Sequence, residues 1–122
     1  MKAILEDGKS IYLQISQSIE EDILNGLIAE EEPVPSTNQL AKYYSINPAT
    51  AAKGVSLLTD EGIIYKKRGI GMYVKTGARE IILNKRRQEF YESFKESLEK
   101  ASGLGIAKSE LIKIIEEGKQ NV

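Results

Sequence analysis

The sequence predicts a mostly helical α+β fold in which three helices precede a β-hairpin and two further helices follow it. Two observations lead to this prediction. Before residue 62, apolar residues recur at helical spacing between helix-capping signals. Residues 63–75 instead hold two short runs of β-branched and aromatic residues on either side of a glycine-containing tip. A chain of 122 residues suffices for one compact domain, or for one domain with a short appendage.

The first predicted helix begins near residue 11. Four isoleucines stand four residues apart and would form one apolar face of this helix: Ile11, Ile15, Ile19 and Ile23. Ser10 can cap the start of the helix, and Gly26 suits the left-handed position after its end.

The second and third predicted helices are short and close together. Ser36 and Gln39 match a capping box, so a helix should start there and end near Tyr44. Asn47 followed by Pro48 is a second start signal, because Asn is a preferred cap and Pro loses no needed N–H at the first helical position. That helix should run to about residue 61. Only about three residues separate the two helices, which is typical of a helix-turn-helix.

The third predicted helix has two different faces. The face expected in the core holds Ala51, Val55 and Leu58. The opposite face holds Ala49, Lys53 and Ser56. Gly54 lies mid-helix, where glycine costs roughly 1 kcal/mol relative to alanine. We therefore expect a close crossing with the preceding helix at this position.

The predicted hairpin follows this helix directly. Its strands should span residues 63–67 and 72–75, with residues 68–71 at the tip. The glycines of the tip permit positive φ angles, and its cations could lie beside a phosphate backbone. With this hairpin as the wing, residues 1–76 are predicted to form a winged helix-turn-helix domain.

The charge distribution indicates which part of the domain would face DNA. The net charge of −1 by itself counts against a polyanionic partner. Acidic residues gather in residues 20–32, here called the acidic zone: Glu20, Glu21, Asp22, Glu30, Glu31 and Glu32. Residues 42–75 hold only Asp60 and Glu61 as anions, against Lys42, Lys53, Lys66, Lys67, Arg68 and Lys75. A polyanion should therefore dock on the central third of the chain.

A helix-turn-helix reads DNA with the N-terminal part of its second helix in the major groove. The candidates on this helix are Asn47, Ala49, Thr50 and Lys53. Ala49 could touch a thymine methyl group, and Lys53 could donate to guanine or to phosphate. The start of the preceding helix could bind phosphate through Ser36, Thr37 and Asn38. The wing candidates are Lys66, Lys67, Arg68, Gly69 and Gly71.

Each of these residues also has a purely structural interpretation. Ser36 and Asn47 would serve as helix caps in any case, so a DNA contact would be an additional role. Lys53 could be an ordinary surface charge, although its place opposite the apolar face favours the DNA role. Residues 66–68 could protect the hairpin edge from pairing with other chains.

The remaining residues, 77–122, form a predicted two-helix tail. A long helix should span residues 78–101 and end at Gly103, and a short helix should run from Ser109 to near Gly118. Two helices bury little apolar surface alone. The apolar residues of the tail therefore need a partner: Leu83, Phe90, Phe94, Leu98, Leu111 and Ile115. They could pack on their own DNA-binding domain, but we favour a two-fold homodimer that presents two recognition helices.

Several segments in order resemble the GntR family of bacterial regulators. They are residues 11–15 (IYLQI), 35–36 (PS), 40–41 (LA), 46–51 (INPATA), 61–64 (EGII) and 69–74 (GIGMYV). The resemblance covers roughly Ser10 to Lys75. The short tail resembles the YtrA-like branch, which has two C-terminal helices in place of a large effector domain. The resemblance implies a repressor that binds an inverted-repeat operator as a dimer. The family usually has arginines, which contact DNA, where this chain has Asn38 and Pro48.

The composition argues against several other classes of protein. Without Cys or His, the chain can form no disulfide framework and no imidazole-based triad, and it lacks the usual ligands of zinc. We expect no enzyme activity, no cofactor and no metabolite pocket in the tail. We see no signal peptide and no apolar run long enough to span a bilayer, so we expect a cytoplasmic protein. The alternative function is a winged-helix protein–protein module that docks a basic partner on its acidic zone.

Overall fold

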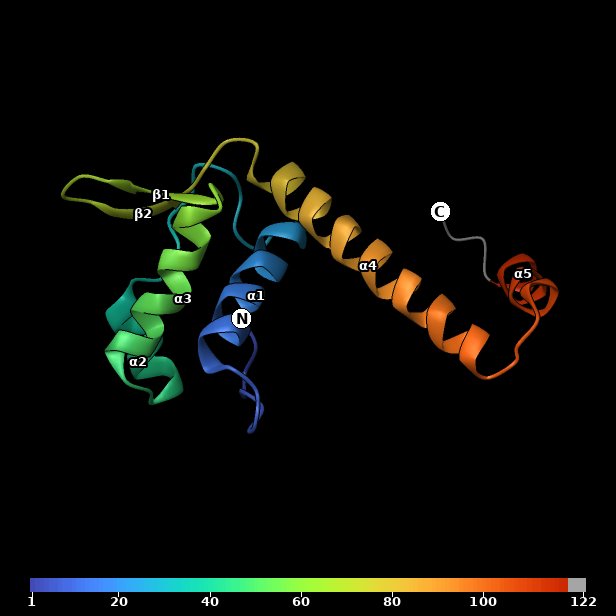
Figure 1. Ribbon diagram of the computed structural model, residues 1–122. Coiled ribbons are helices and arrows are strands. Elements are labelled where there is room, and N and C mark those ends of the chain that lie inside the picture. Colours follow the sequence, from blue (N-terminus) through green and yellow to red (C-terminus); the bar gives the residue numbers. More distant parts are fainter. Residues whose placement is uncertain (119–122) are drawn as a thin grey trace. The chain divides into compact units, whose positions relative to one another are not determined.

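The computed structural model describes residues 1–118, which fall into two compact units (Figure 1). The first unit comprises residues 1–84, and the second begins at Lys85. The elements, in order, are α1 (Ile11–Leu24), α2 (Thr37–Tyr44), α3 (Pro48–Asp60), β1 (Ile64–Lys67), β2 (Gly71–Val74), α4 (Ala78–Gly103) and α5 (Lys108–Glu117). The predicted mostly helical α+β fold is confirmed.

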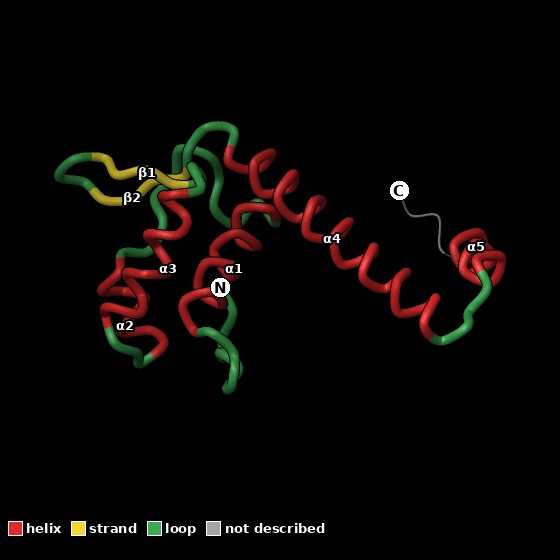
Figure 2. The backbone as a smooth tube through the Cα atoms, in the orientation of Figure 1, coloured by secondary structure: helices red, strands yellow, loops and turns green. Residues whose placement is uncertain are grey.

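Helices α1, α2 and α3 surround the core of the first unit, and the hairpin follows the end of α3 (Figure 2). The isoleucine face of α1 supplies Ile15 and Ile19, which are fully buried. They pack with Leu40 of α2 and Leu58 of α3. Burial of each such side chain contributes roughly 1.5–3 kcal/mol. The core extends into the start of α4, where Ala78 and Ile82 are also fully buried.

The capping signals of α2 and α3 act as the sequence predicts. The Ser36 hydroxyl accepts a hydrogen bond from the Gln39 N–H at 3.1 Å, and the Gln39 side chain accepts one from the Ser36 N–H at 2.8 Å. The Asn47 side chain accepts from the Ala49 N–H at 2.8 Å. At α1 the prediction is only half right, because Ser10 occupies the capping position but its side chain makes no capping hydrogen bond.

Gly54 marks a close helix crossing, but the partner is α1 and not, as predicted, the preceding helix α2. A Cβ atom at Gly54 would lie 2.8 Å from the Tyr12 carbonyl oxygen and 3.2 Å from the Ile15 side chain. The Ser16 hydroxyl donates a hydrogen bond of 2.6 Å to the Gly54 carbonyl. The missing side chain thus lets the backbones of α1 and α3 approach each other closely.

The wing is an antiparallel hairpin in which Ile64 pairs with Val74 and Lys67 pairs with Gly71. Residues 31–34, just before α2, run along the other side of β2. The Glu31 N–H donates to the Val74 carbonyl at 2.8 Å, the Val74 N–H donates to the Glu32 carbonyl at 2.9 Å, and the Val34 N–H donates to the Met72 carbonyl at 2.9 Å. These bonds satisfy the outer edge of β2 and hold the base of the wing against the helical core.

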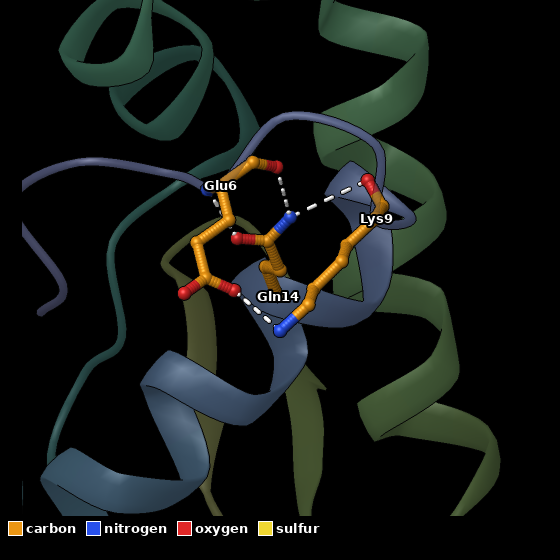
Figure 3. Close-up of polar contacts among 3 residues, drawn as sticks. All are labelled: Glu6, Lys9 and Gln14. Carbon is orange, nitrogen blue, oxygen red and sulfur yellow. Dashed lines mark hydrogen bonds and ion pairs between the residues drawn. The ribbon is translucent and has the colours of Figure 1, made fainter.

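Three residues tie the N-terminal segment to the start of α1 (Figure 3). The Gln14 side chain accepts a hydrogen bond from the Glu6 N–H at 2.7 Å and donates to the Glu6 carbonyl at 2.9 Å. The Lys9 ammonium pairs with the Glu6 carboxylate at 2.6 Å. This hydrogen bond from Lys9 lowers the pKa of Glu6. The contacts cover the buried Gln14 amide and keep its hydrogen bonds satisfied.

The second unit contains the rest of α4 and α5, joined by a tight turn. The Ile106 N–H donates to the Ala101 carbonyl at 3.0 Å, and Gly105 takes the left-handed conformation with φ of 71°. Helix α5 starts at Lys108, one residue before the predicted Ser109. Within residues 1–118, no helix combines the length and the apolar character needed to cross a membrane.

Candidate nucleic-acid interface

The N-terminal half of α3 presents its polar face outward. Ala49 and Lys53 are exposed and Thr50 is half-buried, whereas Ala51 and Val55 on the opposite face are buried in the core. The Asn47 cap and Pro48 at the first helical position set where this face begins. The first unit therefore leaves this side of α3 accessible to a major groove.

The Lys53 ammonium does not extend freely from this face. It lies 4.1 Å from the centre of the Tyr12 ring, which belongs to α1. A cation over an aromatic ring is attracted by the negative potential of the ring face. This contact leaves the ammonium able to meet a phosphate or a guanine.

The start of α2 offers backbone donors on the first helix of the helix-turn-helix. The capping box uses the N–H groups of Ser36 and Gln39. Helix geometry leaves the N–H groups of Thr37 and Asn38 without an intrahelical acceptor. The Asn38 side chain is exposed and Thr37 is half-buried. Such a helix start is suited to a phosphate group.

The wing carries its cations on two faces. Lys66 and Arg68 are exposed, as is Gly69, whose φ of 76° suits a glycine in the tight turn. Lys67 is half-buried, with its ammonium 4.1 Å from the centre of the Tyr73 ring. Gly71 is the first residue of β2 and not part of the tip, although its φ of 138° also favours glycine.

Glu31 links the base of the wing to the start of α4. Its carboxylate accepts hydrogen bonds from the Tyr65 hydroxyl of β1, from the Thr76 N–H at 3.1 Å and from the Thr76 hydroxyl at 2.8 Å. The hydrogen bond from Tyr65 is the main reason that the pKa of Glu31 is lowered, and the same bond raises the pKa of Tyr65. The backbone of Glu31 has a φ of 67°, which is unusual for a residue other than glycine.

The sequence profile described as "Bacterial regulatory proteins, gntR family" matches residues 11–74, from the start of α1 to the end of β2. This chain belongs to the GntR family. It is a DNA-binding transcription regulator and not an enzyme. All the residues that we expect from the sequence to contact DNA lie within this matched region.

Individual relatives agree with the family assignment. The transcriptional repressor YtrA of Bacillus subtilis is 31% identical over 107 residues, which cover 88% of this chain and 82% of YtrA. The regulator YurK of Bacillus subtilis is 32% identical over 94 residues, which cover 74% of this chain but only 39% of YurK. A GntR family regulator from Listeria monocytogenes has a similar structure, with a TM-score of 0.75 and 28% identity over 94% of this chain and 100% of that chain. The match over most of YtrA agrees with the YtrA-like branch.

Sequence reasoning missed three features of this GntR domain. The rings of Tyr12 and Tyr73 lie under two of the proposed DNA-contacting lysines. Lys53 and Tyr12 are far apart in the sequence, whereas Lys67 and Tyr73 are diagonal neighbours in the hairpin, a pair that the strand register indicates. Glu31 was assigned only to the acidic zone, although it contacts Tyr65 and Thr76. These contacts join residues that are 34 to 45 positions apart in the sequence. The one sequence feature that relates to these contacts is the position of Glu31 in the loop between α1 and the capping box of α2.

Most residues of the acidic zone make contacts within the molecule. Glu20 is only 1% exposed and Asp22 is 8% exposed. The Glu30 carboxylate accepts a hydrogen bond from the Arg79 N–H at 3.2 Å in the first turn of α4, and Glu32 accepts one from the Ala29 N–H at 2.7 Å. The pKa of Glu30 is lowered, chiefly by a hydrogen bond from the Gly77 backbone. These contacts give the zone a structural role that needs no basic partner protein.

Replacing Glu31 with Gln should destabilise the GntR domain more at neutral pH than at acidic pH. The folded protein lowers the pKa of Glu31, so the stabilisation by its carboxylate is present above the pKa of the unfolded chain. It is lost as the pH falls through the lower pKa of the folded state. Thermal unfolding followed by circular dichroism between pH 3 and pH 7 measures the difference between wild type and Glu31→Gln. Glu21→Gln on the exposed side of α1 is the matched control, and an equal difference at every pH would contradict the prediction.

Proposed function

We propose that the protein binds an inverted-repeat operator as a homodimer and represses the adjacent genes. The observation that carries this proposal is the outward polar face of α3, on which Ala49 and Lys53 are exposed. The proposed DNA-contacting surface consists of Ser36, Thr37, Asn38, Asn47, Ala49, Thr50, Lys53, Lys66, Lys67, Arg68, Gly69 and Gly71. As a bacterial DNA-binding regulator, the protein would act in the cytoplasm, where the chromosome lies.

The second unit supports the proposal of a homodimer. It is a pair of helices with large apolar side chains in contact with solvent, among them Phe90 at 62% exposure and Ile115 at 58%. The Phe90 and Phe94 rings stack with their centres 6.0 Å apart. Several large apolar side chains exposed on one small unit are typical of a protein–protein contact. A second copy of the same unit would cover it with matching residues and place two recognition helices for two half-sites.

A hollow of about 510 Å³ lies between α4 and α5 in the same unit. It is lined by Leu98, Ser102, Gly105, Ile106, Lys108 and Leu111. All these residues are at least partly exposed, so the hollow is an open groove. In the proposed dimer a second copy fills it, and Leu98 and Leu111 belong to the dimer contact. Leu83 differs from the other predicted dimer residues, since it belongs to the first unit.

Repression is proposed from the match to YtrA. YtrA is named a transcriptional repressor, and 82% of its length aligns with this chain. A dimer seated over an operator can repress simply by occupying the DNA. The exposed Asn38 and Pro48 stand where the family usually has arginines, so we expect fewer charged DNA contacts in this protein.

Selection of bound sequences from random DNA tests the operator proposal. An inverted repeat is the expected result, with half-sites about one helical turn apart or a multiple of it. A set of selected sequences without two-fold symmetry would contradict it.

Lys53→Ala and Arg68→Ala should each weaken binding to the selected operator. If the cation neutralises one phosphate, its removal lowers the slope of log affinity against log salt by about 0.9. A salt titration followed by fluorescence anisotropy measures both affinity and slope. Lys100→Ala on α4 removes an exposed cation outside the proposed surface and should bind like the parent. If both interface variants bind like Lys100→Ala, the surface is wrongly assigned.

A further inference from the structure

Two lysines of the proposed interface are held in the same way. Lys53 on α3 lies over the Tyr12 ring of α1, and Lys67 of β1 lies over the Tyr73 ring of β2. In both pairs the ammonium nitrogen is 4.1 Å from the centre of the ring. The other wing cations, Lys66 and Arg68, are exposed at positions without such a ring contact among the described residues.

The Tyr12 backbone takes part in the close contact between α1 and α3 at Gly54. The Tyr12 carbonyl faces Gly54, where an added Cβ would approach it to 2.8 Å. The next turn of α1 is fixed to the same point by the hydrogen bond from Ser16 to the Gly54 carbonyl, at 2.6 Å. Lys53 directly precedes Gly54. The crossing therefore places the ring and the lysine beside each other, through backbone contacts that do not involve either side chain.

We propose that Tyr12 is a positioning residue for DNA binding, whose ring holds the Lys53 ammonium ready at the outer face of α3. This inference rests on the proposed DNA contact of Lys53. A free lysine side chain loses much rotamer freedom when it binds, and this loss opposes association. A lysine already confined over a ring loses less. The ring neither neutralises the charge nor uses up the ammonium as a buried ion pair would, so the donor stays available to DNA.

The test compares Tyr12→Phe and Tyr12→Leu in full-length protein, each with Lys53 present and with Lys53→Ala. Tyr12→Phe keeps the ring and should bind the selected operator like the parent. Tyr12→Leu removes the ring and should weaken binding roughly two- to fivefold, as expected for an exposed cation–π contact. The salt slope should stay unchanged in Tyr12→Leu, because the number of neutralised phosphates is the same. In the Lys53→Ala background, Tyr12→Leu should have no further effect.

Nuclear magnetic resonance of the protein without DNA gives a second readout. The methylene protons next to the Lys53 ammonium should resonate upfield in the parent because of the Tyr12 ring current. They should return to ordinary positions in Tyr12→Leu and stay shifted in Tyr12→Phe. This measurement, together with a thermal unfolding curve for each variant, separates loss of positioning from loss of folded protein.

Different results would overturn different claims. If Tyr12→Leu weakens binding equally with and without Lys53, the tyrosine acts on DNA or on the fold independently, and the positioning role is wrong. If Tyr12→Phe binds as weakly as Tyr12→Leu, the hydroxyl group matters and not the ring, which also overturns the inference. If Lys53→Ala binds like the parent, the proposed DNA contact of Lys53 fails and the inference fails with it.

Discussion

Replacing both Phe90 and Phe94 with Lys should abolish the proposed dimer, leave a monomer and sharply weaken operator binding. Both rings are exposed in the single chain, so lysine costs little there, but two charges would be buried in the proposed dimer. Loss of the link between two DNA-binding units removes the avidity of two half-sites, a factor of roughly 10²–10⁴. Analytical ultracentrifugation measures the change in mass, and anisotropy with the selected operator measures the affinity.

The control for this variant adds the same charges elsewhere. Ile4 and Leu27 are exposed apolar residues of the first unit, at 79% and 71%. The double variant Ile4→Lys with Leu27→Lys should remain a dimer and keep its affinity for the operator. If the Phe90 and Phe94 variant also sediments as a dimer, the exposed face of α4 is not the contact between copies.

Gly54→Ala should lower the free energy of unfolding, although alanine is the better helix former. In an open helix this change stabilises by about 1 kcal/mol. Here the new Cβ would lie 2.8 Å from the Tyr12 carbonyl, a backbone atom that cannot turn aside. Overpacking of a core typically costs 1–3 kcal/mol. The cost exceeds the gain in propensity over most of this range, so we expect a net loss of up to about 2 kcal/mol.

Urea unfolding monitored by circular dichroism measures this loss. Gly103→Ala is the matched control, because Gly103 is also helical but has no atom within 4 Å of an added Cβ. It should leave the stability unchanged or raise it. Equal stabilisation by Gly54→Ala and Gly103→Ala would show that the α1–α3 crossing relaxes freely, and would contradict the account given above for Gly54.

The two variants that affect Tyr12 address different properties. Gly54→Ala pushes against the Tyr12 backbone, whereas Tyr12→Leu removes only the ring. If the ring is positioned by the crossing, Gly54→Ala should also move the Lys53 methylene resonances. In this account, the packing of α1 on α3 sets the position of the Tyr12 ring, and the ring in turn sets the position of the proposed DNA contact Lys53.

Much of the first unit could be predicted because its signals are local. Ser36 with Gln39, and Asn47 with Ala49, form capping hydrogen bonds between residues at most three positions apart. The isoleucine spacing of α1 predicts a buried face, and Ile15 and Ile19 are fully buried. Outward exposure of Ala49 and Lys53 followed from the helical period alone.

The sequence by itself determined, to within about one residue, where helices and strands begin. It also determined which faces are apolar and which residues of α3 face outward, because each of these depends on neighbours within about one helical turn. Only the tertiary structure decided that Gly54 meets α1, that residues 31–34 pair with β2, and that Glu31 joins β1 to the start of α4. It also decided that Tyr12 lies beneath Lys53. These contacts link residues far apart in the chain, and their partners are set by the angle and distance at which packed elements cross, which no local pattern encodes.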